Sequence, residues 1–360
     1  MKISNRFFAF TLAALFSLPA AAVYAANADP GTTTISYNDA LSEAIAANSQ
    51  LKSLQDSVDL TTKQRNNTQA SLDFMLSSYG ADDPNVRALD RSVNQMNTTI
   101  NNAPLQAQII KGSVEVSLLG SLQAIAGSQT DLQTLKESIS LAEKNLKNFE
   151  LKLNFGMVSA NDVTHARLSL DQSNAQERQL EQQLASQKIA LNYLLGRGPN
   201  ENITVDYTPQ TTPSGFDVER AVKNIPNLAD IKLKQSDVDL AQYAVDSDVS
   251  ANAGISLQEA AQLKQAKRTL ADAVSAKEKA IRSAYSNLLA LQANERNLET
   301  AVQMANAAFT AAVAVFNAGR STQYDVDTAA LNVTQANAAA AKSLYQIAAS
   351  MYTLNNAYLL

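Results

Sequence analysis

The chain has 360 residues and a formal net charge of −5, with no Cys, no Trp, one His, 11 Gly and 8 Pro. The lack of Cys excludes disulfides and thiolate metal sites, and a single His excludes multi-His metal centres. The low Gly and Pro content argues against a loop-rich β protein, and the mild acidity gives no electrostatic basis for binding nucleic acid.

The first 25 residues have the pattern of an export signal. Lys2 and Arg6 are positively charged, and Phe7–Leu18 is largely apolar but too short to span a bilayer. We expect cleavage after Ala25, with Ala28 as the alternative; a retained membrane anchor is the competing interpretation. Because no later run of about 18 apolar residues exists, we expect no helical membrane span in the mature chain.

The rest of the chain is predicted to contain two copies of one helical unit. A shift of about 163 positions aligns Gly156 with Gly319, Asp162 with Asp325, and Val163 with Val326. The starts of the two halves also correspond, since "ALSEAIAANSQL" resembles "VERAVKNIPNL". We assign residues 26–198 to the first half, the proline-containing stretch 199–215 to a linker, and residues 216–360 to the second half.

Each half is predicted to contain two long helices with a coiled-coil period. In the first incoming helix, expected over Val114–Asn154, the apolar residues step by alternating threes and fours: Leu132, Leu135, Ile139, Ala142, Leu146, Phe149 and Leu153. The returning segments continue this seam from Val163 to Leu194 and, with smaller residues, from Val326 to Ile347. Since Ala-rich seams bury little apolar area, these helices need several neighbours, which predicts a multi-helix assembly.

The turns between the long helices carry specific signals. Gly156 and Gly319 stand where a glycine ends the incoming helix in a left-handed conformation. Three residues later, Ser159 and Thr322 each begin an S/T-x-x-D pattern, a variant of the capping box that opens a helix. Each half is therefore predicted to be a long αα-hairpin.

On these residues the sequence resembles the TolC-like outer-membrane efflux family over essentially the whole mature chain. The resemblance rests on the duplicated half, on the "AL..A...N..L" start and on the G-x₅-D-V turn used twice; "AGRSTQYDVDTAALNVTQA" is the most family-like stretch. It implies three protomers whose twelve helices enclose a periplasmic tunnel. The expected fold class is all-α: two duplicated halves of long coiled-coil-like hairpins, a TolC-like α-barrel protomer with little or no β structure.

The sequence differs from the family in the region where the family has the strands of its outer-membrane barrel. Each such strand needs about 9–11 residues of alternating polarity. In residues 66–110, where the family has strands, the apolar residues instead follow helical spacing around a turn at Tyr79–Asn85. The corresponding second-half stretch, Asp246–Leu257, is too short for two spanning strands. We therefore expect the barrel strands to be absent or vestigial.

The resemblance also assigns roles at the hairpin turns. Asp325 matches an aspartate that lines the family's periplasmic aperture, Asp327 is a further carboxylate close by, and Asp162 matches a first-half aspartate of the network that closes the aperture. Three-fold assembly turns one aspartate per chain into a ring that favours cations. Helix capping is the competing and compatible role. The residues expected to be available to a periplasmic adaptor protein are Gly156, Met157, Gly319, Arg320 and Ser321.

No catalytic, cofactor-binding or metal-binding constellation is predicted, and His165 is interpreted as a surface or inter-helix residue. The expected function is that of a passive conduit component of a tripartite efflux or type I secretion-like export system. Its expected partners are two further copies of the chain, a periplasmic adaptor and an inner-membrane pump, in the periplasm or at the outer membrane. The alternative is a non-conducting periplasmic scaffold or envelope spacer.

Overall fold

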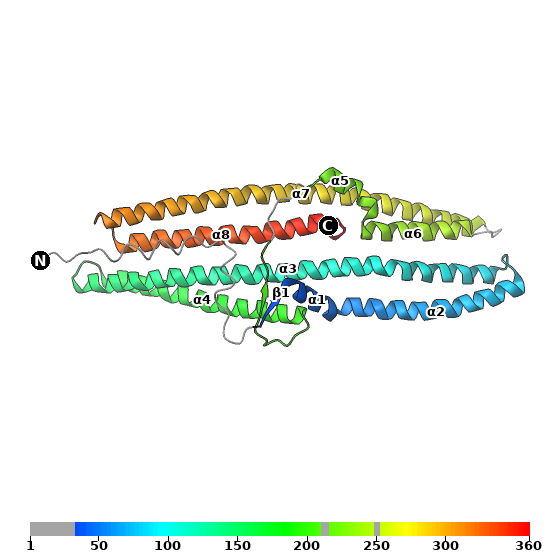
Figure 1. The fold of residues 1–360 in the computed structure, drawn as a ribbon, viewed down its shortest axis with the longest axis horizontal. Coiled ribbons are helices and arrows are strands. Elements are labelled where there is room, and N and C mark those ends of the chain that lie inside the picture. The colour runs from blue at the N-terminus through cyan, green and yellow to red at the C-terminus, as the bar shows by residue number, and fades with distance from the viewer. Residues whose placement is uncertain (1–32, 210–215, 248–252) are drawn as a thin grey trace.

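The computed structural model describes residues 33–209, 216–247 and 253–360 (Figure 1). The predicted export signal lies outside these residues. The described elements are β1 (Thr33–Ser36), α1 (Tyr37–Ala47), α2 (Ser49–Tyr79), α3 (Pro84–Asn154), α4 (Ala160–Leu194), β2 (Ile203–Asp206), α5 (Val218–Lys223), η2 (Ile225–Asn227), α6 (Ala229–Asp246), α7 (Ala253–Asn317), α8 (Gln323–Asn355) and η3 (Ala357–Leu359). The prediction of an all-α fold with little β structure is confirmed.

Two very long helices organise the molecule (Figure 1). Helix α3 has 71 residues and α7 has 65, so α3 is roughly 107 Å long at about 1.5 Å per residue. Helices α2 and α4 pack along α3, while α6 and α8 pack along α7. Further contacts of α3 with α6 and α8 join the two halves. The result is an elongated layer of helices with α2 and α4 at one edge and α7 at the other.

We call the end that carries the α3–α4 and α7–α8 turns the proximal end, and the opposite end the distal end. At the distal end, α2 and α3 are joined by the turn Gly80–Asp83, inside the predicted turn Tyr79–Asn85. The helical spacing predicted for residues 66–110 is confirmed, since these residues lie in α2, the turn and α3. The predicted start of the long helix at Val114 is wrong, because α3 begins 30 residues earlier, at Pro84.

This early start has a local cause. The Asp83 side chain accepts hydrogen bonds from the backbone N–H groups of Asn85 and Val86, at 2.8 and 3.4 Å. Pro84 follows in the first helical turn, where a missing N–H costs nothing. A second proline, Pro104, lies inside α3 without ending it. Capping and favourable packing of α3 against α2 thus extend the helix through a stretch that also contains a helix-breaking residue.

The strands in the described chain lie at the middle of the molecule, which we call the equator. Strands β1 and β2 have four residues each and pair in parallel, with Thr33 opposite Ile203 and Ser36 opposite Asp206. Strand β2 lies within residues 199–215, which the sequence analysis assigned to a linker. Beside it, Arg197 makes two hydrogen bonds of 2.6 Å to Glu43 of α1. These contacts fix the linker to the start of the first half.

The core is thin and continuous with the predicted seams. All seven seam residues predicted in α3 are buried or half-buried, as are the seam residues predicted from Val163 to Leu194 and from Val326 to Ile347. The largest buried cluster lies at the equator, where α1 and the strands cover α3: Ala40, Ala44, Val114, Leu118, Leu122, Ile125, Leu191, Leu195, Ile203 and Val205. The coiled-coil pattern therefore identified the inward faces correctly.

By length and composition alone, two helices contain a window apolar enough to cross a membrane: α3, and Ser256–Asn317 within α7. The sequence analysis, which required an unbroken apolar run, expected none. The two windows differ in environment, since 39% of the window in α3 is buried within the chain but none of the window in α7 is. The α7 window therefore has no fully buried residue in the described part of the chain, although several of its side chains are half-buried.

Candidate functional site

The two proximal turns have the same backbone geometry. Gly156 and Gly319 have φ angles of +69° and +70°, the left-handed conformation predicted for both. In the first turn, the N–H groups of Gly156 and Met157 donate to carbonyls of the preceding helix, each at 2.9 Å. In the second turn, Gly319 and Arg320 do the same at 2.8 and 3.0 Å. Both incoming helices therefore end in a Schellman-type motif.

Both returning helices begin with the predicted capping box. Asp162 accepts hydrogen bonds from the N–H and hydroxyl of Ser159, at 2.8 and 2.7 Å, and its own N–H donates back to the Ser159 hydroxyl. Thr322 and Asp325 repeat this arrangement, with both bonds to the carboxylate at 2.8 Å. The hydrogen bonds from Ser159 and Thr322 lower the pKa of Asp162 and Asp325 below their usual values. The capping role is confirmed; the aperture role stays a prediction.

Asp327 has a different environment. Burial of its carboxylate opposes ionisation, but hydrogen bonds from Lys144 and Gln323 hold the pKa of Asp327 below its usual value. The Lys144 ammonium lies 2.8 Å from the Asp327 carboxylate. Since Lys144 belongs to α3 and Asp327 to α8, this ion pair joins the two halves near the proximal end. The sequence analysis missed Lys144, because neither spacing nor motif connects residues 183 positions apart.

The proximal turns also expose apolar side chains. Met157 is 70% exposed, and its neighbour Phe155 is 79% exposed. Gly156, Gly319 and Arg320 are exposed as well, whereas Ser321 is half-buried. Phe155 was not among the predicted contact residues, although it lies beside Gly156 in the sequence. The first turn therefore exposes apolar side chains and the second turn exposes a basic one.

The described residues of the proximal end do not resemble a catalytic or metal-binding site. His165 is exposed on the first turns of α4. Within the described residues, no group of three or more His, Cys, Asp or Glu side chains is arranged to hold a metal ion. The proximal chemistry of the described chain therefore consists mainly of caps, ion pairs and exposed apolar groups.

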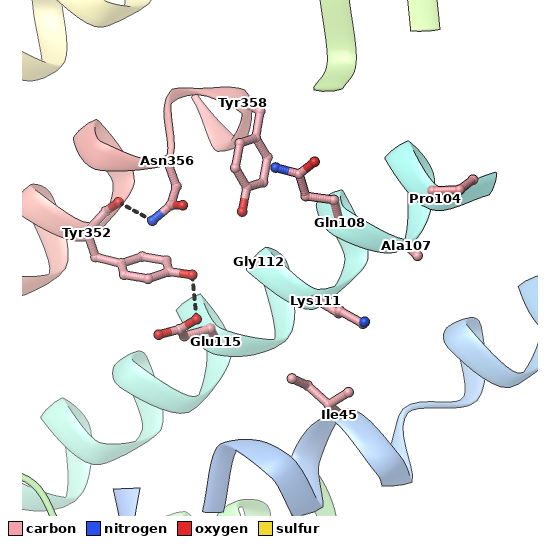
Figure 2. A pocket seen from close by; sticks show the side chains of 10 residues that line it. All are labelled: Ile45, Pro104, Ala107, Gln108, Lys111, Gly112, Glu115, Tyr352, Asn356 and Tyr358. Atoms are coloured by element: carbon pink, nitrogen blue, oxygen red, sulfur yellow. Dashed lines mark hydrogen bonds between the residues drawn. The ribbon is translucent and has the colours of Figure 1, made fainter. Parts of the chain in front are cut away.

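A second polar cluster lies at the equator (Figure 2). The Glu115 carboxylate of α3 accepts hydrogen bonds from the hydroxyls of Tyr37 and Tyr352, at 2.9 and 2.7 Å. Burial, reinforced by the bond to Glu115, raises the pKa of both tyrosines. Because Tyr37 lies on α1 and Tyr352 on α8, Glu115 connects the beginning of the first half with the end of the second. The sequence analysis did not single out this junction.

Beside Glu115, an open groove of about 470 Å³ runs along α3 between α1 and η3 (Figure 2). One wall is Tyr358, which packs directly on Gly112. A Cβ atom at Gly112 would lie 2.7 Å from the Tyr358 hydroxyl oxygen and 3.0 Å from a Leu359 methyl carbon. Gly112 is thus required for the close approach of the C-terminal segment to α3.

Comparison with solved structures identifies the fold. The outer membrane protein VceC of Vibrio cholerae is 16% identical, with 75% of each chain covered and a TM-score of 0.58. The CmeC outer membrane channel of Campylobacter jejuni is 13% identical over 89% of this chain and 85% of its own, with a TM-score of 0.63. CusC, whose structures concern transmembrane channel formation, is 14% identical over 92% and 94%, with a TM-score of 0.65.

The chain therefore has the TolC-like fold of outer-membrane channels, as the resemblance of its turns and half starts predicted. No family model and no curated protein matches the sequence.

Gly112 and Gly120, both in α3, provide a matched test of the equatorial contact. Gly112→Ala should lower the free energy of unfolding, because overpacking against Tyr358 costs about 1–3 kcal/mol and exceeds the gain in helix propensity. Gly120→Ala should raise it by about 1 kcal/mol, since a Cβ there meets no atom within 4 Å. Denaturant unfolding measures both; equal effects of the two substitutions would contradict the close contact.

The capping aspartates should make stability depend on pH. Their pKa values are lowered in the folded chain, so their contribution is fully present above the ordinary Asp pKa of about 3.9 and is lost as the pH falls through the lowered values. The double substitution Asp162→Asn and Asp325→Asn should therefore destabilise the protein at pH 7, by an amount that shrinks in acid. Denaturant unfolding across this pH range measures the effect. Asp171→Asn, on the exposed face of α4, is the control and should change little.

Proposed function

We propose that the chain is the protomer of a closed ring of three copies, and that this ring is the passive conduit of a tripartite efflux or type I secretion-like export system. The observation that carries the proposal is a pair of uncovered, uncharged seams at the two edges of the helical layer. One seam lies on α7 and the other on α4.

The α7 seam occupies the proximal third of that helix. Residues 300–319 contain no charged side chain. Within them, four exposed residues follow the spacing of a coiled-coil seam: Met304, Ala308, Ala311 and Val315. Met304 is 64% exposed. This face points away from α8, whose contacts bury other positions of α7.

The α4 seam has the same spacing and is also uncharged. Its exposed members are Leu168, Gln172, Ala175, Gln179, Gln182, Ser186, Ile189 and Tyr193. Leu168 is 60% exposed, and Tyr193 is exposed to a similar extent. An apolar or uncharged stripe of this length on a helix is typical of a surface that another helix covers.

A second copy of the chain supplies the missing cover. When the α7 seam of one copy packs on the α4 seam of the next, the contact is head-to-tail, and repetition of such a contact generates a ring if the rotation closes. The number of three is what the family resemblance implies, and the likeness in fold to outer-membrane channels supports it. Neither seam is self-complementary in position, since they lie on opposite edges of the layer.

At the proximal end, we propose that the exposed surface around Gly156, Met157, Gly319, Arg320 and Ser321 binds a periplasmic adaptor, which couples the ring to an inner-membrane pump. The turn aspartates Asp162, Asp325 and Asp327 would then form rings of carboxylates at the aperture and favour cations. Opening requires the halves to separate, and the Lys144–Asp327 ion pair is one of the contacts that such a movement would break. The ring would act in the periplasm or at the outer membrane after removal of residues 1–25.

The alternative function, a non-conducting periplasmic scaffold or envelope spacer, is favoured by one observation. In the TolC-like family, membrane strands stand in this part of the chain. Here α2 and α3 are joined at the distal end of the described chain by only four residues, Gly80–Asp83. A scaffold requires no closed ring, so the oligomeric state separates the two functions.

The ring predicts a specific effect of charge on the α7 seam. Met304→Glu should dissociate the trimer, because it buries a carboxylate in an uncharged contact. Gln303→Glu, one residue away on the same exposed helix but outside the seam, should leave the trimer intact. Light scattering of the mature protein with and without detergent measures the mass. A wild-type monomer in both conditions would exclude the conduit and leave the scaffold.

Adaptor binding is tested by a photo-crosslinking residue placed at Met157. In intact cell envelopes it should capture a periplasmic adaptor, whereas the same residue at Leu60, exposed on α2 near the equator, should not. Capture of the same protein from both positions, or from neither, would argue against the proximal turns as the adaptor site.

A further inference from the structure

Several polar contacts link α3 to the second half along the length of the molecule. From the distal to the proximal end they include Asp90 with Tyr243, Arg91 with Ser247 and Glu259, Asn102 with Ser236, Glu115 with Tyr352, Asp131 with Lys342, and Lys144 with Asp327. Together they span the interface between the halves. The distal contacts differ in burial from the two proximal ion pairs.

The distal contact is the most elaborate. The Arg91 guanidinium donates to the Glu259 carboxylate at 2.6 Å, to the Ser247 hydroxyl at 3.0 Å and to the Ala244 carbonyl at 3.2 Å. One side chain of α3 thereby holds both the end of α6 and the beginning of α7. On the preceding residue, the Asp90 carboxylate accepts a hydrogen bond from Tyr243 of α6, which raises the pKa of Tyr243 to about 12.

Burial makes this contact hard to break. The Glu259 side chain is only 10% exposed, and its second carboxylate oxygen has no hydrogen-bond partner in the described chain. Arg91 is therefore the cation that compensates this charge. When one member of a buried pair is removed, the remaining charge is left without compensation, which destabilises the arrangement far more than the loss of a surface pair.

The proximal contacts are weaker in kind. The Asp131–Lys342 pair is exposed on both sides, and Lys144 is exposed opposite a partly covered Asp327. Each is one ion pair between flexible side chains, a type that contributes little to stability in water. The polar contacts between the halves are thus more buried and more numerous at the distal end, and more exposed at the proximal end.

We infer that Arg91 is a positioning residue that fixes the distal ends of the two halves to each other, so that separation of the halves is confined to the proximal side of the equator. The fixed distal end is a property of the isolated chain. Only its consequence for conduction rests on the proposed function.

Spin labels measure this directly, because the chain contains no Cys of its own. Labels at Phe74→Cys on α2 and Leu257→Cys on α7 report the distal distance between the halves. Labels at Met157→Cys and Arg320→Cys report the proximal distance. We expect a narrow distal distribution and a broader proximal one in otherwise wild-type protein.

Three substitutions complete the test. Arg91→Ala should broaden the distal distribution and shift it to longer distances, and Arg91→Lys, which keeps the charge but not the three-way contact, should restore it in part. Arg87→Ala is the matched control: Arg87 lies one turn away on α3 but pairs at 2.6 Å with Asp82 inside the first half, so the distal distribution should not change. Circular dichroism shows whether each variant retains its helices.

The inference is overturned if Arg91→Ala and Arg87→Ala give the same distal distribution, or if the wild-type distal distribution is as broad as the proximal one. These distances are independent of transport. The two proposals can fail separately. If the chain is monomeric, the conduit is contradicted; if its distal distribution is narrow only when Arg91 is present, the positioning role is still supported.

Discussion

The structure depends on the packing of one helix, α3, against helices on both of its sides. It contacts α1, α2 and α4 of its own half and α6 and α8 of the other. Most seam residues that make these contacts are half-buried rather than buried, so no single pair of helices encloses a core. Because an isolated pair of this kind gains little free energy, each helix is stable only as part of the layer. The same constraint leaves the two outer edges in need of a neighbour.

Much of the local structure follows from short-range signals in the sequence. The positive φ angles at Gly156 and Gly319, and the capping boxes opened by Ser159 and Thr322, depend on residues within one helical turn of each other. The inward faces of α3, α4 and α8 follow from a periodic pattern that a single helix displays. The helical character of residues 66–110 was readable for the same reason. Where the determinant is local, the sequence was sufficient.

The parts that escaped prediction depend on distant contacts. Strand β2 has four residues and pairs with a strand about 170 positions earlier, so its own sequence carries no strong signal. The partners Lys144, Glu115 and Arg91 meet residues more than 150 positions away in the second half. The start of α3 at Pro84 was missed although residues 66–110 show helical spacing, because the continuity of one helix through Pro104 depends on packing against α2 and α6. Such features require the assembled layer.

The length of α3 has a consequence for how a protein of this kind changes in evolution. Because α3 is packed along α4 on one side and α8 on the other, an insertion in α3 alone would shift every seam residue beyond it out of register. A longer proximal end therefore requires insertions of about seven residues, the period of the seam, in all four proximal helices together. The length of the proximal end can therefore change only when all four helices gain or lose the same number of heptads. This favours duplication or loss of whole heptads over insertions of single residues.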